Sequence, residues 1–373
     1  MMTRFIFFAF LGLTLLFGSH FFLYFSGIHF FQITSPKTKG IILAVLALGS
    51  VSFFLASLLA HYRENFFSIS LYAVAGFWLG LVANLFLASL LLWIFYPLVS
   101  RWNPPATAGV FFCLALLLSI YGTWNAFHPK VKNIAVTIPN LPAAWQGKTA
   151  VQISDVHLGH LYRSGFAEKL AQKVNAQNPD IVFITGDLFD GMDGSLLNFV
   201  RPLGEIKAKQ GTFFVTGNHE TYLGLDKTFD ILEQIQVKTL DDRVATIDGL
   251  QIIGYSYPPR EEMEDPKEKS KSLAATVKKM EGFVPGKPTI LLHHAPTDIA
   301  EAKSLGVNLQ LSGHTHKGQL FPFNFITHWI YKGYDYGLRT EGSYSIYTSN
   351  GIGTWGPPMR TFNTPEIVTI TLQ

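Results

Sequence analysis

The sequence predicts a protein in two parts, an N-terminal all-α bundle of four transmembrane helices followed by an α/β domain. Two observations carry this prediction. The first third of the 373-residue chain holds four long apolar stretches that are nearly free of charge. In the remainder, short β-branched or aromatic runs recur, and five of them end directly at a cluster of carboxylate, amide or imidazole side chains.

The four apolar stretches are each long enough, or nearly so, to cross about 30 Å of hydrocarbon. They cover residues 5–25, 41–59, 67–98 and 108–124. The third exceeds one crossing, which indicates either a tilt or a break near residues 76–80. A cleaved signal peptide is an alternative for the first stretch, but no small-residue cleavage site clearly follows it. Buried helices of a soluble domain are a second alternative, disfavoured by four successive runs of this length.

The domain boundaries follow from these stretches. A transmembrane part is predicted over residues 1–127, a linker with the first strand over 128–147, and one α/β domain over 148–373. The formal net charge of +3 is spread along the chain. It lacks the clustered basic patch that nucleic-acid binding requires, so no nucleic-acid partner is expected.

Basic residues beside the spans give a weak indication of orientation. Four spans place both ends of the transmembrane part on one side of the membrane. That side carries Arg4, Arg63, Lys130 and Lys132, and the other side carries Lys37, Lys39 and Arg101. The small excess favours a cytoplasmic α/β domain. The single cysteine, Cys113, lies in the fourth stretch and cannot form an intrachain disulfide.

Five polar clusters follow predicted strands of the α/β domain. They are Asp155-Val156-His157, Gly186-Asp187, Gly217-Asn218-His219-Glu220, His293-His294 and Gly313-His314-Thr315-His316. Binding sites of open α/β sheets lie outside the carboxyl ends of strands, so the five clusters can converge on one crevice. Carboxylate, amide and imidazole ligands without a thiolate suit a pair of divalent metals. The pattern predicts a metal-dependent hydrolase.

This ordered set of motifs resembles the five signatures of the calcineurin-like metallophosphoesterases. The resemblance covers the α/β domain and implies the family's architecture, two β-sheets packed between helices. Gly318-Gln319 after the last motif, and the tail over residues 349–354 with Pro357 and Arg360, are similar to the bacterial membrane-associated branch. That branch includes phosphodiesterases and UDP-diacylglucosamine pyrophosphatases of lipid A synthesis. Lys317 departs from it, since glycine is usual at this position.

The resemblance implies two metal sites that share the Asp187 carboxylate. Asp155, His157 and His316 would complete the first site, and Asn218, His294 and His314 the second. A shared ligand offsets the repulsion between two cations held about 3.5–4 Å apart. Manganese is the expected metal, with iron, zinc and magnesium as alternatives.

Other polar residues of the motifs have predicted roles around the metals. His219 is expected to stabilise or protonate the leaving group, and a purely structural histidine is the alternative. His160 and Lys317 are candidate substrate contacts, although His160 could instead orient a ligand and Lys317 could face solvent. His293 precedes a ligand on a strand, so alternation predicts that it faces the opposite side in a packed or hydrogen-bonded role. Glu220 is expected to contact substrate or to orient a neighbouring ligand.

Two segments outside the motifs could shape access to the site. Residues 261–287 are rich in Glu and Lys around a stripe of Leu273, Val277 and Met280, which predicts an amphipathic surface helix, with a membrane-facing lid as the alternative. Residues 319–338 are dense in aromatic side chains. Aromatic rings favour the membrane–water interface, so this segment is expected either there or in the core.

Together these features predict a membrane-bound enzyme that hydrolyses a phosphodiester or pyrophosphate bond in a lipid or lipid precursor such as UDP-diacylglucosamine. By resemblance, it would lie in a bacterial inner membrane, and the small excess of basic residues would place its catalytic domain in the cytoplasm. One alternative is a phosphodiesterase for soluble nucleotides or exported phosphoesters. The other is a sensor or transporter with a regulatory phosphoesterase domain, and the scarcity of ionisable residues in the spans argues against a transporter.

Overall fold

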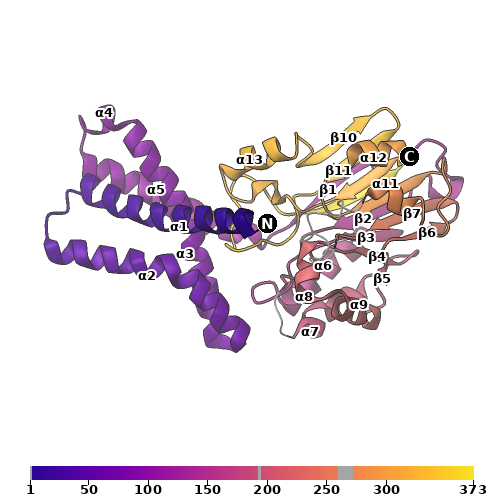
Figure 1. The fold of residues 1–373 in the computed structure, drawn as a ribbon, viewed down its shortest axis with the longest axis horizontal. Helices are drawn as coiled ribbons and strands as arrows, with labels where there is room; N and C mark the ends of the chain where they lie inside the picture. Colours follow the sequence, from indigo (N-terminus) through magenta and orange to yellow (C-terminus); the bar gives the residue numbers. More distant parts are fainter. Residues whose placement is uncertain (1, 192–194, 259–271) are drawn as a thin grey trace. The chain divides into compact units, whose positions relative to one another are not determined.

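The computed structural model describes residues 2–191, 195–258 and 272–373. The chain forms two compact units (Figure 1). The first contains Met1–Asn125 and Gly356–Thr361, and the second contains Ala126–Trp355 and Phe362–Gln373. The short segment Gly356–Thr361, which the sequence assigns to the α/β domain, therefore belongs structurally with the N-terminal helices.

Four long helices and one short helix build the first unit. They are α1 (Met2–Phe30), α2 (Pro36–Tyr62), α3 (Phe66–Ile94), α4 (Tyr96–Val99) and α5 (Pro104–Ala126). All four long helices hold segments that are long and apolar enough to cross a membrane: Gly12–Phe30, Pro36–Tyr62, Phe66–Ile94 and Pro104–Ala126. The predicted set of four apolar helices is confirmed. Helix α3 is continuous through residues 76–80, so the alternative of a break there is wrong.

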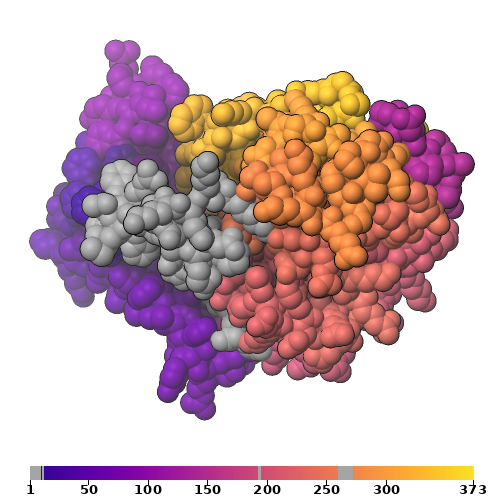
Figure 2. Space-filling view, turned by 45° about the vertical axis from the view of Figure 1, so that its right-hand side comes forward, coloured from indigo at the N-terminus to yellow at the C-terminus, as the bar shows by residue number. Residues whose placement is uncertain are grey.

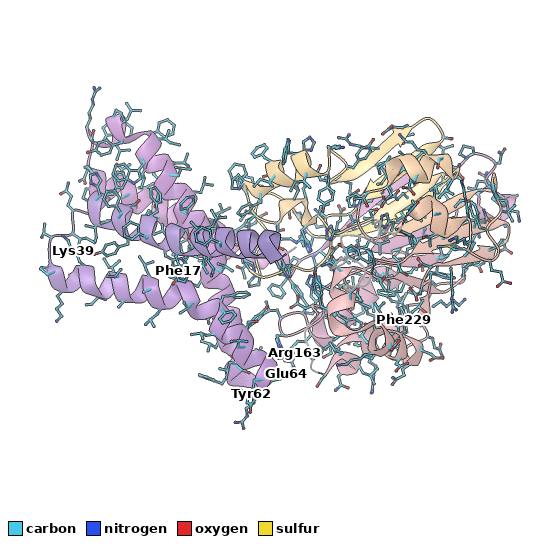
Figure 3. The ribbon with its side chains drawn as sticks, viewed as in Figure 1. Phe17, Lys39, Tyr62, Glu64, Arg163 and Phe229 are labelled. Carbon is cyan, nitrogen blue, oxygen red and sulfur yellow. The ribbon has the colours of Figure 1, made fainter. Side chains whose placement is uncertain are left out.

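The surface of these helices suits a hydrocarbon environment. Large apolar side chains are exposed along them, including Phe17 of α1, while Tyr62 marks the exposed end of α2 (Figure 3). Inside the unit, polar groups pair across helices. Asn84 Nδ2 donates to Ser119 Oγ at 2.9 Å, and Trp93 Nε1 donates to Ser26 Oγ at 2.9 Å. Such pairing is required where water cannot satisfy a polar group.

The segment Gly356–Thr361 packs against glycines of α3 and α5. A Cβ atom on Gly76 would lie 2.9 Å from Pro358 Cδ, and one on Gly80 would lie 2.7 Å from Met359 Cε. The segment is also hydrogen-bonded to α5, because Arg360 N donates to Gly122 O at 2.9 Å. Small residues four positions apart let a neighbouring backbone approach a helix closely. The glycines of α3 thus accommodate this segment within an unbroken helix.

We predict that Gly122→Leu destabilises the first unit. A Cβ at this position would lie 2.8 Å from Met359 Cγ and 3.2 Å from Arg360 O, so a larger side chain must displace the docked segment. The expected cost is about 1–3 kcal/mol, seen as a lower melting temperature of the detergent-purified protein. Gly109→Leu on the same helix is the control, because a Cβ there meets no atom within 4 Å. Equal melting temperatures of the two variants would contradict the packing argument.

The second unit contains two six-stranded sheets. The first has the order β1-β12-β2-β3-β4-β5. Its strands are β1 (Lys130–Val136), β12 (Glu366–Leu372), β2 (Thr149–Ile153), β3 (Ile181–Thr185), β4 (Thr212–Val215) and β5 (Lys238–Thr239). The second has the order β10-β11-β9-β8-β7-β6. Its strands are β10 (Gly337–Glu341), β11 (Tyr344–Thr348), β9 (Leu309–Ser312), β8 (Thr289–His293), β7 (Leu250–Tyr255) and β6 (Arg243–Ile247).

The two sheets face each other across one apolar core and carry helices on their outer faces. Phe183 and Val215 of the first sheet share this core with Ile252, Leu292 and Leu311 of the second. The first sheet is covered by α6 (Ser164–Asn175), α7 (Leu196–Val200) and α9 (Leu225–Gln234), and the second by α11 (Leu273–Val277) and α12 (Ile299–Ser304). In Figure 2 the orange and yellow parts of the chain, which follow residue 272, adjoin on one face of this unit. The predicted α/β architecture of two sheets between helices is confirmed.

The predicted amphipathic surface helix over residues 261–287 is wrong in its described part. Residues 261–271 lie outside the described residues. From Leu273 onward, the helix is α11, only five residues long. The apolar stripe of Leu273, Val277 and Met280 is buried in the core beneath the second sheet. Core packing therefore accounts for this stripe.

Parallel pairing places the motif-bearing strand ends together. Strands β2, β3 and β4 are parallel neighbours, and so are β8 and β9. Each is directly followed by one of the five polar clusters. Because the carboxyl ends of parallel strands meet at one edge, each sheet delivers its clusters to a single edge.

Candidate dinuclear metal centre

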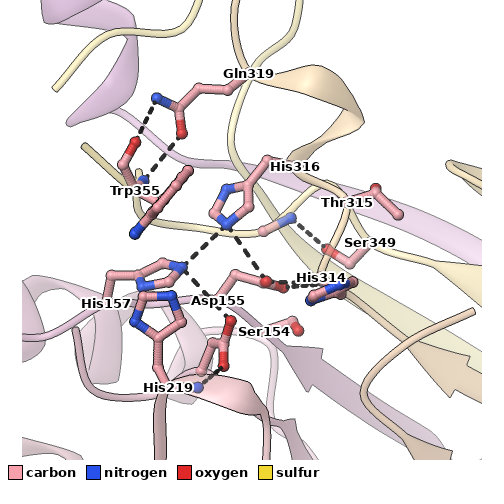
Figure 4. Close-up of polar contacts among 12 residues, drawn as sticks. Ser154, Asp155, His157, His219, His314, Thr315, His316, Gln319, Ser349 and Trp355 are labelled. Carbon is pink, nitrogen blue, oxygen red and sulfur yellow. Dashed lines mark hydrogen bonds and ion pairs between the residues drawn. The ribbon is translucent and has the colours of Figure 1, made fainter. Parts of the chain in front are cut away.

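Ligand-type side chains from both sheets converge at this edge (Figure 4). Within the described part of the chain, three groups of carboxylate and imidazole side chains have ligand atoms within 4.8 Å of one another. The groups are Asp155–His157–His316, His157–Asp187–His219 and Asp187–His294–His314. Almost all of these side chains are buried. The arrangement brings together six of the seven ligands that the resemblance implies. The seventh, Asn218, directly precedes His219, whose backbone N–H bonds Asp187.

Asp187 lies between the first and the last of these groups. Its Oδ2 atom is 3.1 Å from His294 Nε2 and 4.0 Å from His157 Nε2. On one side, His157 Nε2 is 3.0 Å from His316 Nε2. On the other side, His294 Nε2 is 3.2 Å from His314 Nδ1. One carboxylate oxygen thus faces ligands of both predicted metals, as a bridging ligand must.

Asn218 supplies an observation that fits a bound cation. It is the first residue of helix α8 (Asn218–Leu223). Its Oδ1 atom is buried and has no hydrogen-bond partner among the described residues. Leaving a buried polar atom unpaired costs about 1–3 kcal/mol, which a metal–oxygen contact would remove. Together with imidazole and carboxylate donors, this oxygen completes a donor set suited to two divalent metals.

The ligands adopt an uncommon backbone conformation. Asp155, His157 and Asp187 have φ values of 51°, 51° and 48°, and His314 and His316 have values of 72° and 47°. Residues other than glycine rarely occupy this left-handed region, and clustered examples mark functional sites. The surrounding buried sheets must hold these loops in place, because the loops alone would relax.

Two glycines allow backbone N–H groups to reach the metal-binding carboxylates. A Cβ on Gly217 would lie 2.2 Å from Asp187 Oδ1, and one on Gly313 would lie 2.2 Å from Asp155 Oδ2. With no side chain there, His219 N donates to Asp187 Oδ1 at 2.9 Å, and His314 N donates to Asp155 Oδ1 at 2.9 Å. The bond from His219 fixes the Asp187 carboxylate with Oδ2 facing His294 and His157.

Without bound metal, the negative charge of Asp187 is paired mainly with the imidazole of His294. Burial by itself would raise the pKa of Asp187, but the imidazoles of His294 and His157 hold it well below its usual range. Burial would also lower the pKa of His294, yet the Asp187 carboxylate raises it to about 10. A metal bound at His294 Nε2, which lies 3.1 Å from Asp187 Oδ2, would displace the proton shared by this pair, so metal affinity would rise with pH.

The buried Glu220 carboxylate holds the backbone of two loops that carry ligands. It accepts hydrogen bonds from Gly217 N at 2.7 Å, Asp187 N at 3.0 Å and Phe189 N at 3.2 Å. Burial and the nearby Asp187 charge raise the pKa of Glu220 to about 7. These contacts give Glu220 an orienting role. His293 lies apart from the ligands, since its Nε2 atom contacts Asp298 Oδ2 at 3.0 Å and Thr297 Oγ1 at 3.1 Å.

His219 is held beside His157, with their rings 4.6 Å apart. Its Nδ1 atom lies 3.0 Å from Asp190 O. A carbonyl oxygen only accepts, so Nδ1 carries the proton and Nε2 is left for substrate. Burial and the neighbouring His157 lower the pKa of His219. Asp190 also places Oδ1 at 3.5 Å from His157 Nδ1. Asp190 was not among the predicted site residues, although it lies only three positions after Asp187.

The two candidate substrate contacts lie in different settings. His160 is buried in the loop between β2 and α6, and its substrate role stays a prediction. Lys317 has φ 48° and ψ 38°, a conformation that favours glycine. Its Nζ atom lies 4.2 Å from the centre of the Tyr336 ring, a cation–π contact. A contact between Lys317 and substrate would require this side chain to move.

Aromatic side chains form a rim around the ligands. Tyr222 and Trp355 have rings 5.4 Å and 6.4 Å from that of His219, and both are exposed. Tyr257 and Tyr331 have rings 6.1 Å from that of His314. Trp355 is held by a pair of 3.0 Å hydrogen bonds between its backbone and the Gln319 side-chain amide (Figure 4). Of these four rim residues, only Tyr331 lies in the aromatic segment over residues 319–338 that was visible in the sequence.

The geometry defines a class of protein. An α/β fold of two sheets joins two ligand groups through one carboxylate and places an imidazole beside them, which is the arrangement of a dinuclear metal hydrolase. The calcineurin-like phosphoesterase family matches residues 148–318, a range that includes all seven ligands. The chain belongs to this family, and its α/β unit is that of a metal-dependent phosphoester hydrolase.

Related proteins carry the same domain. A metallophosphoesterase of Helicobacter pylori strain 26695, whose function is uncharacterised, is 32% identical over 70% of this chain and 70% of its own length. A second, from strain J99, is 33% identical over 67% of this chain and 66% of its own. Similarity to solved structures is weak; a dimetal phosphatase from Danio rerio has a TM-score of 0.33 and 14% identity, covering 61% of this chain and 93% of its own.

One relative extends the similarity into the helical unit. A transmembrane protein with a metallophosphoesterase domain from Bos taurus is 29% identical over 90% of this chain and 80% of its own length. Coverage this wide must include part of the N-terminal helices. With four apolar helices of spanning length, this similarity identifies the chain as a membrane protein.

We predict that His294→Ala loses bound metal and that His293→Ala keeps it. His294 faces Asp187 and His314, whereas its neighbour His293 contacts Asp298 and Thr297. Metal content after manganese loading and dialysis should fall from two ions towards one in the first variant. It should stay at two in the second, whose lost hydrogen bonds cost about 1–3 kcal/mol of stability. Equal metal contents in both variants would contradict the assignment.

Proposed function

We propose that this protein is a membrane-bound phosphoesterase that hydrolyses a phosphodiester or pyrophosphate bond in a lipid or lipid precursor. UDP-diacylglucosamine is the first substrate to test, and it requires a catalytic unit in the cytoplasm of a bacterial cell. The observation that carries the proposal is the exposed aromatic rim around a dinuclear metal site, in a chain whose first unit consists of apolar helices.

The residues of the site divide the work of ester hydrolysis. When bound, two divalent cations supply a nucleophilic hydroxide at neutral pH and neutralise charge on the phosphate oxygens. Asp187 holds the shared position, fixed by His219 N and by the bond from its own N–H to Glu220. His219 presents Nε2 beside His157, where its protonated imidazolium form would stabilise or protonate the leaving oxygen. Manganese is the metal we propose.

The rim supports an amphipathic substrate over a small polar one. Trp355 is 63% exposed and Tyr222 is 55% exposed, although both lie beside the buried His219. Exposed aromatic rings next to a charged centre can bind the apolar or planar part of a ligand whose phosphate reaches the metals. A soluble nucleotide also offers a planar base, so this alternative needs a direct comparison of substrates.

The membrane anchor favours the lipid-linked substrate over the soluble nucleotide. The second unit begins at Ala126, the last residue of the apolar helix α5. A site tethered directly to a span has a high effective concentration for substrates that lie in the bilayer. A soluble substrate gains nothing from this tether. We therefore place a lipid-linked phosphate ahead of a soluble nucleotide.

We predict that Asp187→Asn abolishes hydrolysis of every phosphate ester that the wild type accepts. Loss of the shared carboxylate should lower kcat by more than about 100-fold, the range found for residues that merely orient ligands. The assay uses detergent-purified protein with manganese, and follows bis-p-nitrophenyl phosphate and UDP-diacylglucosamine in parallel. Asp226→Asn, which changes an exposed carboxylate on α9, is the control.

The outcomes separate the candidate functions. Release of UMP from UDP-diacylglucosamine by the wild type alone supports the lipid pyrophosphatase. If the wild type hydrolyses bis-p-nitrophenyl phosphate but not UDP-diacylglucosamine, the protein is a phosphoesterase and UDP-diacylglucosamine is rejected as its substrate. Loss of neither activity in Asp187→Asn would contradict the metal site, and no activity in the wild type would favour a regulatory domain.

A further inference from the structure

We propose that helix α13 and the aromatic residues at its base form a docking surface that lies in the headgroup region of the bilayer spanned by the N-terminal helices. This α13 surface consists of Phe321, Phe323, Phe325, Ile326, Trp329, Ile330 and Phe362. It differs from the metal centre and needs no particular substrate. The occupant to which we commit is lipid.

Helix α13 (Phe323–Ile330) is apolar, yet it has no buried residue. Trp329 is 80% exposed and Phe325 is 64% exposed, and Phe323, Ile326 and Ile330 are exposed as well. Soluble domains rarely leave a contiguous group of this kind in water, because covering large apolar side chains releases about 1.5–3 kcal/mol each. A covering partner is therefore expected.

The α13 surface is continuous with the chain that packs among the spans. The ring of Phe325 lies 5.8 Å from that of Phe321, which lies 5.0 Å from that of Phe362. Phe362 is 70% exposed and directly follows Thr361, a buried residue of the helical unit. Phe362, a residue of the α13 surface, is therefore joined by a single peptide bond to a segment that belongs to the helical unit.

The level at which Thr361 packs favours the interface of the membrane. A Cβ on Gly122 of α5 would lie 3.0 Å from Thr361 Cγ2. Gly122 is four residues before Ala126, where α5 ends, which corresponds to about 6 Å along the helix. Phe362 therefore leaves the helical unit near the end of a span. Phe and Trp side chains at this level favour the headgroup region, and the exposed Lys332 just after α13 can pair with lipid phosphate.

Docking of α13 would place the metal centre at the lipid surface. Tyr331 directly follows α13, and its ring lies 6.1 Å from that of the ligand His314. The rim would then open within reach of lipid headgroups. This consequence rests on the proposed function, whereas the docking itself does not.

Depth measurement on the full chain tests the docking without any substrate. Cys113→Ser removes the single cysteine, and Trp329→Cys then carries a nitroxide in protein reconstituted into vesicles of phosphatidylethanolamine and phosphatidylglycerol. The control label is on Lys169→Cys, an exposed position of α6. We expect the label at 329 to collide more with oxygen, and less with a water-soluble nickel chelate, than the label at 169.

Two results would overturn the docking. Equal nickel accessibility at both positions would leave α13 in water. Protection from both oxygen and nickel, with an immobilised spectrum, would show a protein partner or a second copy of this chain in place of lipid. If the wild type hydrolysed no phosphate ester, the proposed function would be wrong, but the accessibility measured at position 329 would still test the docking.

A pair of charge substitutions tests whether docking serves catalysis. Trp329→Glu should lower the ratio of lipid-substrate turnover to bis-p-nitrophenyl phosphate turnover in vesicles by roughly tenfold or more, because effective concentration at the interface is lost. Val284→Glu, at an exposed apolar position of the same unit, should leave the ratio unchanged. If Trp329→Glu and Val284→Glu gave the same ratio, the α13 surface would have no role in bringing the lipid substrate to the site.

Discussion

The Asp187 carboxylate is the constraint on which the metal centre depends. One oxygen faces ligands that come from β2 and β8, and the other is held by the N–H of His219. The backbone N–H of Asp187 is held in turn by the buried Glu220. Gly217 must lack a side chain for these bonds to form, because a Cβ there would overlap Asp187 Oδ1. His219, Glu220 and Gly217 thus act together to fix the position of the shared ligand Asp187.

The sheets make this support possible. Five ligands have positive φ angles, a conformation that costs free energy for residues other than glycine. The loops that hold them begin at buried strands of two sheets packed on a common core. Rigid strands on both sides fix where each loop starts, so the strained ligands meet at one point. The same edge carries the aromatic rim, which we propose to bind the apolar or planar part of the substrate.

Sequence reasoning reached the ligands because two simple rules combine there. Buried strands are visible as β-branched runs, and the residue after each such run lies at the carboxyl edge of a sheet. Convergence of Asp155, Asp187 and His294 follows from these rules and from the family resemblance. Asp190, whose carboxylate lies near His157 Nδ1, does not directly follow a strand, so these rules alone do not indicate it.

Features that depend on contacts between distant loops could not be reached. Tyr222, Tyr257 and Trp355 belong to three separate segments, and no periodicity in the sequence indicates that they surround the same histidines. The glycines of α3 suggested a possible break, whereas they accommodate the distant segment that contains Pro358 and Met359. The stripe at Leu273 and Val277 has helical spacing, but spacing alone does not distinguish a surface helix from one turn packed on a core.

The central claim is that Asp187 joins two metal ions in one centre. Electron paramagnetic resonance of the wild type during manganese titration tests it most directly, because spins that share a bridging ligand are coupled. We predict that two manganese ions bind per chain, and that the spectrum at saturation is that of two magnetically coupled ions. A single bound ion, or two ions with independent spectra, would contradict the account.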